Sequence, residues 1–201
     1  MKQLVLFFLV MMLAACGSTS GIKGSDGTSL DLNLSDYESV VVLDFTDATK
    51  KSNLPDFAGR NFADRIAAGI REKQVFKNVS RSPIDEKSVI VSGEITKYNE
   101  GSSALRLLVG FGAGSSHFDA NVNLTDSQTS EKLGEIVVDK KSWALGGIMA
   151  STQTVDGFMN GAAKKIASEL ADAKERIVRP AEREAASMQD SEKVVVEGSS
   201  E

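Results

Sequence analysis

The sequence predicts a domain of the α/β class, an α+β sandwich in which a mixed, mostly antiparallel sheet is covered by two helices. Three observations lead to this prediction: a β-branched run at residues 39–45, a strict alternation of apolar and polar residues at 118–125, and two segments with apolar residues at helical spacing. Helical segments separated by strands in this way are typical of helices packed on a sheet.

The first half of the predicted domain contains a strand, a helix and a short strand. Residues 39–45 (SVVVLDF) are almost continuously apolar, as expected for a central strand covered on both faces. A helix is expected over residues 54–74, because Pro55 fits the first turn of a helix. Its large apolar side chains recur at every fourth position, namely Phe62, Ile66 and Ile70. A short strand or sheet edge is expected at residues 75–79.

The second half begins with strands. Residues 89–98 (VIVSGEITKY) are predicted to form one strand, and residues 118–125 a second with one buried face. Residues 126–131 are polar and predict the turn of a hairpin, with the return strand at 133–143. The buried face of the alternating strand consists of Phe118, Ala120, Val122 and Leu124.

The last helix is expected to begin at Thr154, whose side-chain oxygen can cap it, and to end before Pro180. Beyond that point, residues 180–201 are acidic and contain few large apolar side chains, which predicts a disordered tail. The exception is the short run at 194–196, which suits an edge strand.

Residues 1–15 are predicted to be a signal peptide. Lys2 provides a charged start, residues 4–13 are an almost unbroken apolar run, and small residues precede Cys16, the only cysteine. A membrane-spanning helix needs about 20 apolar residues, roughly twice this length. The glycine, serine and threonine that follow Cys16 argue against a buried helix, so the alternative is an ordinary secretory signal.

The tetrapeptide that ends in Cys16 (LAAC) resembles the lipobox of bacterial lipoproteins, in which the cysteine is acylated and becomes the first mature residue. This resemblance implies a membrane anchor, because each buried CH2 contributes about 0.8 kcal/mol. Gly17 stands where aspartate retains lipoproteins at the inner membrane in enterobacteria-like sorting, which implies the outer membrane and a periplasmic domain. Residues 16–36 would then be the lipidated cysteine and a flexible tether, and residues 37–179 the single domain.

Composition argues against several classes of function. The formal net charge is −5 and becomes one unit more negative when Lys2 is removed with the signal peptide. An acidic chain is poorly suited to binding nucleic acid. One cysteine and one histidine do not supply the ligand cluster that zinc requires, so we expect no metal and no other cofactor.

Residues 101–114 are rich in glycine and apolar side chains. They do not match a phosphate loop, because Ser115 replaces the last glycine of the dinucleotide fingerprint and a strand follows instead of a helix. Three interpretations stay open: a core segment packed through its glycines, a protein contact, or a membrane contact. The candidate contact residues are Leu105, Arg106, Leu107, Leu108, Phe111 and Trp143.

Two of these residues have specific alternatives. Arg106 interrupts an apolar run, so its guanidinium must reach solvent or an acceptor. It either forms an internal salt bridge that holds the loop or binds a carboxylate or lipid phosphate of a partner. Trp143, next to the apolar, glycine-rich residues 144–150, is either an interfacial anchor or a core residue. Two such stretches flank the hairpin, which favours an interaction surface.

Residues 93–102 (GEITKYNEGS), followed by Arg106 and by GFGAG at 110–114, resemble a bacterial lipoprotein family that carries only a domain-of-unknown-function label. The resemblance covers residues 40–178, and Ser130 departs from it because members usually have glycine in the hairpin turn. The layout is also distantly similar to the curli-secretion, exopolysaccharide-export and peptidoglycan-synthase-activator lipoproteins. This similarity implies a non-enzymatic periplasmic α/β domain that acts in rings or as a partner activator.

The only histidine, His117, begins the alternating strand and is expected to point with Asp119 and Asn121 away from the core. A hydrolase that uses Ser116 and His117 is a less favoured alternative, because no nucleophile elbow accompanies them; no catalytic residue is expected. Asp44 and Asp47 follow the first strand, and capping of a turn is favoured over cation binding.

We therefore expect a non-catalytic envelope lipoprotein, anchored in the outer membrane through Cys16, that binds envelope proteins or itself as an interaction or assembly module. The alternative is a subunit of an oligomeric secretion or export complex.

Overall fold

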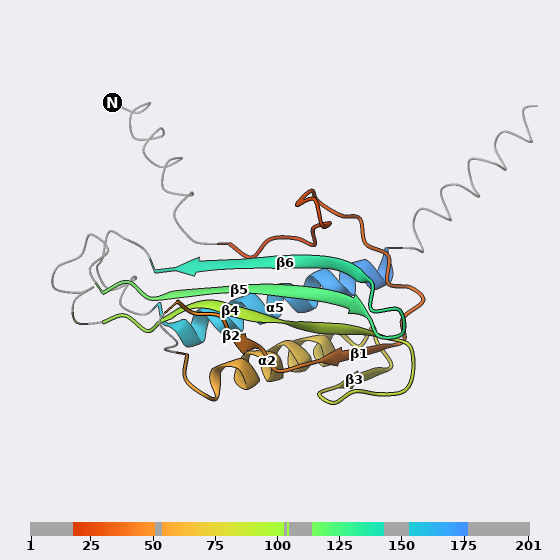
Figure 1. Cartoon of the computed structure of the whole chain (residues 1–201), viewed down its shortest axis with the longest axis horizontal. Helices are drawn as coiled ribbons and strands as arrows, with labels where there is room; N and C mark the ends of the chain where they lie inside the picture. Colours follow the sequence, from red (N-terminus) through yellow and green to blue (C-terminus); the bar gives the residue numbers. More distant parts are fainter. Residues whose placement is uncertain (1–17, 51–53, 103, 105–113, 143–152, 177–201) are drawn as a thin grey trace, which may run out of the picture.

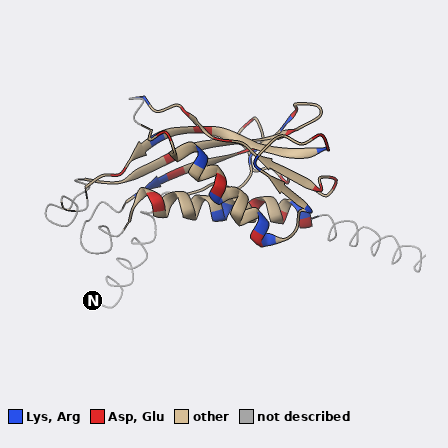
Figure 2. Ribbon diagram, turned by 90° about the horizontal axis from the view of Figure 1, so that it is seen from below, with Lys and Arg blue, Asp and Glu red and all other residues tan. Residues whose placement is uncertain are grey.

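The computed structural model describes residues 18–50, 54–102, 104, 114–142 and 153–176 of the chain. In this part of the chain a six-stranded mixed sheet and two helices form two layers, and both helices cover the same face of the sheet (Figures 1 and 2). The predicted α+β class is confirmed. The elements are β1 (Ser39–Val42), β2 (Thr46–Asp47), α2 (Ala58–Lys73), β3 (Asn78–Ser80), β4 (Ser88–Asn99), β5 (His117–Asp126), β6 (Lys132–Lys141) and α5 (Val155–Glu175).

The strand order is β3-β1-β4-β5-β6, with β2 beside the second half of β4. The short strands pair in parallel, whereas β4, β5 and β6 form the long antiparallel ladders. The turn between β5 and β6 occupies the predicted residues, and it is closed by a hydrogen bond from Asp126 N to Glu131 O at 2.9 Å. The prediction of a mixed, mostly antiparallel sheet is therefore confirmed.

The strand predicted at residues 39–45 is interrupted. Between the pairs Val42–Val91 and Thr46–Glu94, this part of the chain contains one residue more than β4. Phe45 at the interruption is buried, and its ring packs edge-on against Phe62 of α2 at 4.9 Å between centroids. The prediction of one continuous strand was wrong, because this contact with a helix later in the chain turns Phe45 into the core.

The two helices begin differently from one another. Ala58 N donates to Pro55 O at 2.8 Å, so the residues around Pro55 form a turn and α2 begins at Ala58, later than predicted. In α5 the predicted cap is confirmed, because Thr154 Oγ1 accepts from Gly157 N at 3.1 Å.

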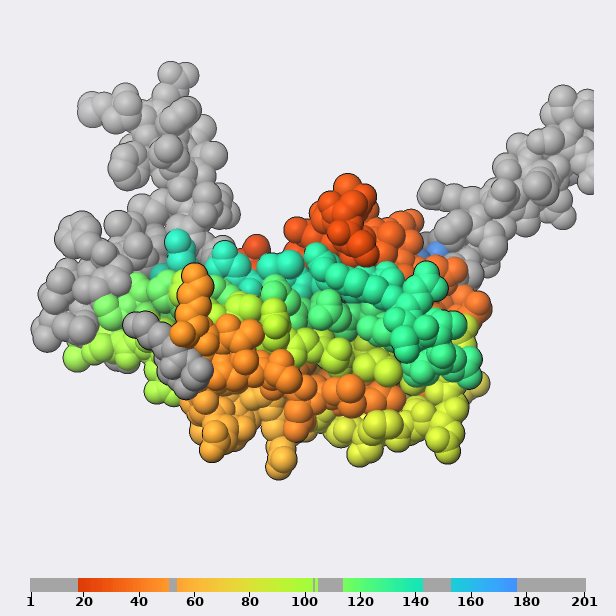
Figure 3. All heavy atoms as spheres, viewed as in Figure 1, coloured from red at the N-terminus to blue at the C-terminus, as the bar shows by residue number. Residues whose placement is uncertain are grey.

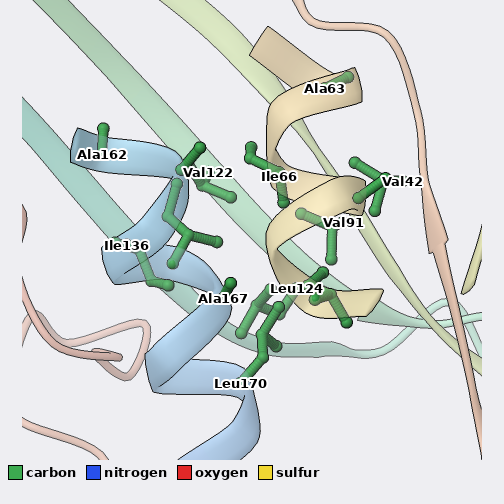
Figure 4. Close-up of a cluster of buried hydrophobic side chains, with 14 of the residues drawn as sticks. Val42, Ala63, Ile66, Val91, Val122, Leu124, Ile136, Ala162, Ala167 and Leu170 are labelled. Carbon is green, nitrogen blue, oxygen red and sulfur yellow. The ribbon is translucent and has the colours of Figure 1, made fainter. Parts of the chain in front are cut away.

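The core lies between the helices and the sheet, where aliphatic side chains of both layers interdigitate (Figure 4). Small residues let the layers approach: a Cβ on Gly69 of α2 would lie 3.1 Å from the Cβ of Ala167 in α5. In β4, a Cβ on Gly93 would lie 2.0 Å from Asn121 O. This close approach explains the glycine at position 93 of the quoted motif.

The described part of the predicted tether is not free. Ile22, Leu32 and Leu34 are buried in the core, and Thr19 and Lys23 form bridges with β6. The prediction of a flexible tether over residues 16–36 was wrong for residues 18–36, and the packed domain begins before residue 37. Four apolar residues spaced along this polar segment provide enough burial to hold it: Ile22, Leu30, Leu32 and Leu34.

In the described residues, neither helix has the length and apolar character needed to cross a bilayer. The predicted signal peptide (1–15) and acidic tail (180–201) lie outside the described residues.

Candidate functional site at one end of the sheet

The three long strands share one end, which we call the loop end, where β4 finishes, β5 begins and β6 finishes. Asn99 pairs with His117, and His117 pairs with Lys141. Just beyond them, Ser102 N donates to Gly114 O at 2.8 Å, which closes the base of the connection between β4 and β5. Gly101 and Gly114 have φ values of 68° and 69°, a conformation that favours glycine.

Ser116 holds the loop end together. Its side chain is fully buried, and its hydroxyl donates to Glu100 O at 2.6 Å and contacts Gln153 O at 3.3 Å. Its backbone N–H donates to Ser142 Oγ at 2.9 Å. Ser116 therefore links the ends of all three long strands to the start of α5.

The predicted contact residues fall outside the described part of the chain: Leu105, Arg106, Leu107, Leu108, Phe111 and Trp143. The predicted lipidation residue Cys16 and the predicted sorting residue Gly17 also lie outside it. Their described neighbours, however, meet at the loop end. Ala104 and Gly114 bracket the first segment, and Ser142 precedes Trp143. Ser18, two residues after Cys16, accepts a hydrogen bond from Asp139 N through its carbonyl oxygen at 2.9 Å. The contact function of these residues stays a prediction.

The pair considered for hydrolysis is not assembled. Ser116 is buried on the helix side, whereas His117 lies with Asp119 on the opposite face of the sheet, as predicted. His117 Nδ1 is buried and has no hydrogen-bond partner among the described residues. Because the hydroxyl of Ser116 donates to a main-chain carbonyl, it is not positioned to transfer a proton to His117.

The face of the sheet without helices is open (Figure 3). The side chains that β5 places on this face are polar. Lys97 Nζ lies 3.8 Å from Asp119 Oδ2, and Asp139 pairs with Asp119 across the strands. Burial raises the pKa of Asp119, and the ammonium of Lys97 opposes that shift. In Figure 2, basic and acidic residues are interspersed along the ribbon.

A hollow of about 610 Å³ lies near the loop end. The residues that line it carry ammonium, amide, hydroxyl and carboxylate groups: Thr49, Lys50, Thr96, Lys97, Tyr98, Asn99 and Asp119. A register shift between Ile95 and Lys97 brings Lys97 opposite Asp119. Among the described residues, no group of three or more histidines, cysteines and carboxylates is arranged to hold a metal ion.

The two aspartates after β1 have structural roles. Asp47 Oδ1 accepts from Thr49 N at 2.7 Å, a turn cap as predicted, and hydrogen bonds from Thr49 lower the pKa of Asp47. Asp44 instead pairs with Arg81, which also binds Asp64 at 2.7 Å and the carbonyl of Val42. The sequence did not single out Arg81, because its partners are far apart in the chain.

These features define a two-layer α+β domain. At the loop end the segments that connect the long strands come together, and the described residues there do not form an assembled catalytic centre. The chain belongs to the family described as Domain of unknown function (DUF4410), whose model matches residues 31–146. The predicted resemblance to a family with that kind of label is thereby confirmed.

The fold is shared with solved structures. The PelC dodecamer from Paraburkholderia phytofirmans is similar with a TM-score of 0.53 and 13% identity, over 77% of this chain and 97% of that chain. A point variant of the same dodecamer gives a TM-score of 0.51 at the same identity and coverage. A neuraminyllactose-binding hemagglutinin homolog from Helicobacter pylori reaches 0.42 at 9% identity, covering 76% and 91%. No curated protein matches the sequence significantly. At 13% identity the likeness to the two PelC structures concerns the fold alone.

Proposed function

We propose that this protein is a non-catalytic envelope lipoprotein, anchored in the outer membrane through Cys16, whose periplasmic domain binds protein partners through the loop end. One observation carries this proposal. The described neighbours of Cys16, of residues 105–111 and of Trp143 all lie at the same end of the sheet, although they are far apart in the sequence.

The anchor rests on chemistry in the sequence. A charged start, an apolar run and LAAC ending in the only cysteine support acylation at Cys16. Two or more acyl chains hold a protein on a bilayer stably, because each buried CH2 contributes about 0.8 kcal/mol. Gly17 in place of aspartate supports sorting to the outer membrane.

The non-catalytic assignment rests on the geometry around Ser116 and His117. These residues lie on opposite faces of the sheet, and the hydroxyl of Ser116 is engaged by the carbonyl of Glu100. Among the described residues, the loop end thus offers structural hydrogen bonds and no nucleophile paired with a base.

A second candidate function is a subunit of an oligomeric export or secretion complex. One observation favours it: PelC from Paraburkholderia phytofirmans is a dodecamer and shares this fold over 97% of its length. Self-association of this chain through the loop end would be a special case of the proposed interaction module.

Crosslinking in living cells tests the proposed contact. A photo-crosslinking residue is placed at Leu107, Leu108 or Phe111, and a control is placed at Gln128, which is exposed in the turn at the opposite end. We expect a defined protein adduct from the loop positions and none from the control. An adduct of doubled subunit mass would indicate self-association. Capture of lipid alone, or of nothing, would refute a protein contact at this end.

A further inference from the structure

We infer that the N-terminal segment holds the domain in one orientation on the lipid surface, with the loop end facing the headgroups. This inference deepens the proposed function and rests on its lipid anchor at Cys16. The N-terminal segment is defined here as residues 18–23, which lie along the outer edge of β6 (Figures 1 and 3).

Main-chain hydrogen bonds fix this segment to β6. Asp139 N donates to Ser18 O at 2.9 Å, Ser20 N donates to Val137 O at 2.9 Å, and Lys23 and Glu135 exchange two bonds of 2.8 and 2.9 Å. Val137 N adds a bond to Ser20 Oγ at 2.9 Å. The segment therefore continues the sheet and fills backbone positions that β6 would otherwise expose.

Side-chain burial locks the same segment against sliding. Ile22 is 4% exposed, and a Cβ on Gly134 of β6 would lie 2.7 Å from its Cγ2. Gly21 lies beside the carboxylate of Glu169 in α5, since a Cβ there would be 3.4 Å from Oε2. Only glycine at position 134 leaves room for Ile22, so the register of the segment on β6 is specific.

The direction of the segment determines which end meets the membrane. It runs antiparallel to β6, so its first residue, Ser18, lies beside Asp139, close to the loop end. One residue, Gly17, separates Cys16 from Ser18, so the Cα atoms of Cys16 and Ser18 lie at most about 7 Å apart. A free tether of the predicted length would instead allow roughly 25 Å between its ends, by the scaling for flexible linkers.

The two ends of the sheet are far enough apart for the orientation to be measured. β5 and β6 each contain ten residues, which corresponds to about 34 Å at about 3.4 Å per residue. Lys141 is exposed at the loop end, whereas Gln128 is exposed in the turn at the other end. Arg176, the last described residue, pairs with Asp31 and follows α5 at that other end (Figure 1).

Energy transfer to labelled lipid headgroups tests the orientation. Because acylation consumes the only native thiol, Lys141→Cys and Gln128→Cys each provide a single site for a donor dye. The lipidated full chain is placed in vesicles of phosphatidylethanolamine and phosphatidylglycerol that carry a headgroup acceptor. We expect at least threefold higher transfer efficiency from position 141 than from position 128. Equal efficiencies from the two positions would overturn the inference.

An insertion provides the matched control. Twelve glycine and serine residues inserted between Gly17 and Ser18 should leave every hydrogen bond to β6 intact but lengthen the connection to the lipid anchor. The difference in transfer efficiency between positions 141 and 128 should then fall to near zero. If the difference persists, the N-terminal segment is not what orients the domain and the inference is overturned. Flotation of the unlabelled protein with the vesicles is measured first, because it shows whether the protein is attached to the membrane. Failure to float would refute the anchor itself, whereas flotation with equal transfer would refute only the orientation.

Discussion

At the scale of single residues, Ser130 adopts a backbone conformation that favours glycine. Its φ is 61°, in the left-handed region. A side chain in that conformation costs roughly 1–2 kcal/mol. The hairpin tolerates this cost because Asp126 holds the turn, accepting from Gln128 N at 2.7 Å and Thr129 N at 2.8 Å.

Ser130→Gly should therefore stabilise the domain. We expect an increase of about 0.5–1 kcal/mol in the free energy of unfolding, because relief of strain exceeds the extra chain entropy of glycine in the unfolded state. Urea titration followed by circular dichroism measures the change. Ser130→Ala keeps the strain and should shift the midpoint little. A loss of stability in the glycine variant would contradict the assigned turn conformation.

Asp126 links the same turn to the N-terminal part of the domain. Its Oδ2 accepts from the buried Tyr37 hydroxyl at 2.7 Å. This bond and those of the turn lower the pKa of Asp126 from 3.8 to about 2. Because the folded-state pKa is lowered, the contribution of Asp126 is complete above the unfolded-state pKa and is lost as the pH falls through the folded-state value.

Thermal unfolding measured between about pH 4 and about pH 2, the pH range that the two pKa values define, reports this contribution. The wild-type domain should lose stability steadily as the pH falls through this range. Asp126→Asn should reduce the slope without abolishing it, since Glu38, Asp47 and Glu86 also have lowered pKa values. An unchanged slope in the asparagine variant would show that Asp126 does not titrate as described.

At the scale of elements, patterns within a single strand or helix were read correctly from the sequence. The alternation predicted at residues 118–125 appears as buried side chains that alternate with partly or fully exposed ones, and the capping residue Thr154 starts α5. These features depend on neighbours within a few residues, which the sequence displays directly.

Features that depend on distant contacts were missed. The strand that begins at residue 39 is interrupted because Phe45 packs on Phe62. Residues 18–36 are held in place because they pair with β6 and pack into the core. The role of Ser116 at the loop end also required three chain segments to meet. The glycine- and serine-rich composition of this segment predicted a tether. Composition alone does not show that β6 and α5, later in the chain, provide a surface on which the segment packs.

Ile22→Ala distinguishes a packed N-terminal segment from a tether. We expect a loss of about 2–5 kcal/mol in the free energy of unfolding, the range for truncating a buried isoleucine to alanine. Ser25→Ala, at an exposed position of the same region, should change stability by less than about 0.5 kcal/mol. Chemical denaturation of residues 18–176 provides the comparison. Equal stabilities of the two variants would instead support a flexible tether.

At the scale of the whole molecule, the architecture separates two roles. The helices cover one face of the sheet and form the core with it (Figure 1). The loop end brings together the described residues that neighbour the proposed anchor and contact residues in the sequence. Stability thus comes from the helix–sheet layer. Sequence changes in the loops at this end should therefore cost the core little stability.

The identity of the first mature residue decides whether the domain is a lipoprotein. Intact-mass spectrometry of the protein extracted from membranes with detergent measures it directly. We predict a chain that begins at Cys16 and carries added acyl mass, and a Cys16→Ser variant that retains its first fifteen residues. A mature chain that begins at any other residue, or one that begins at Cys16 without acyl mass, would contradict the proposed anchor.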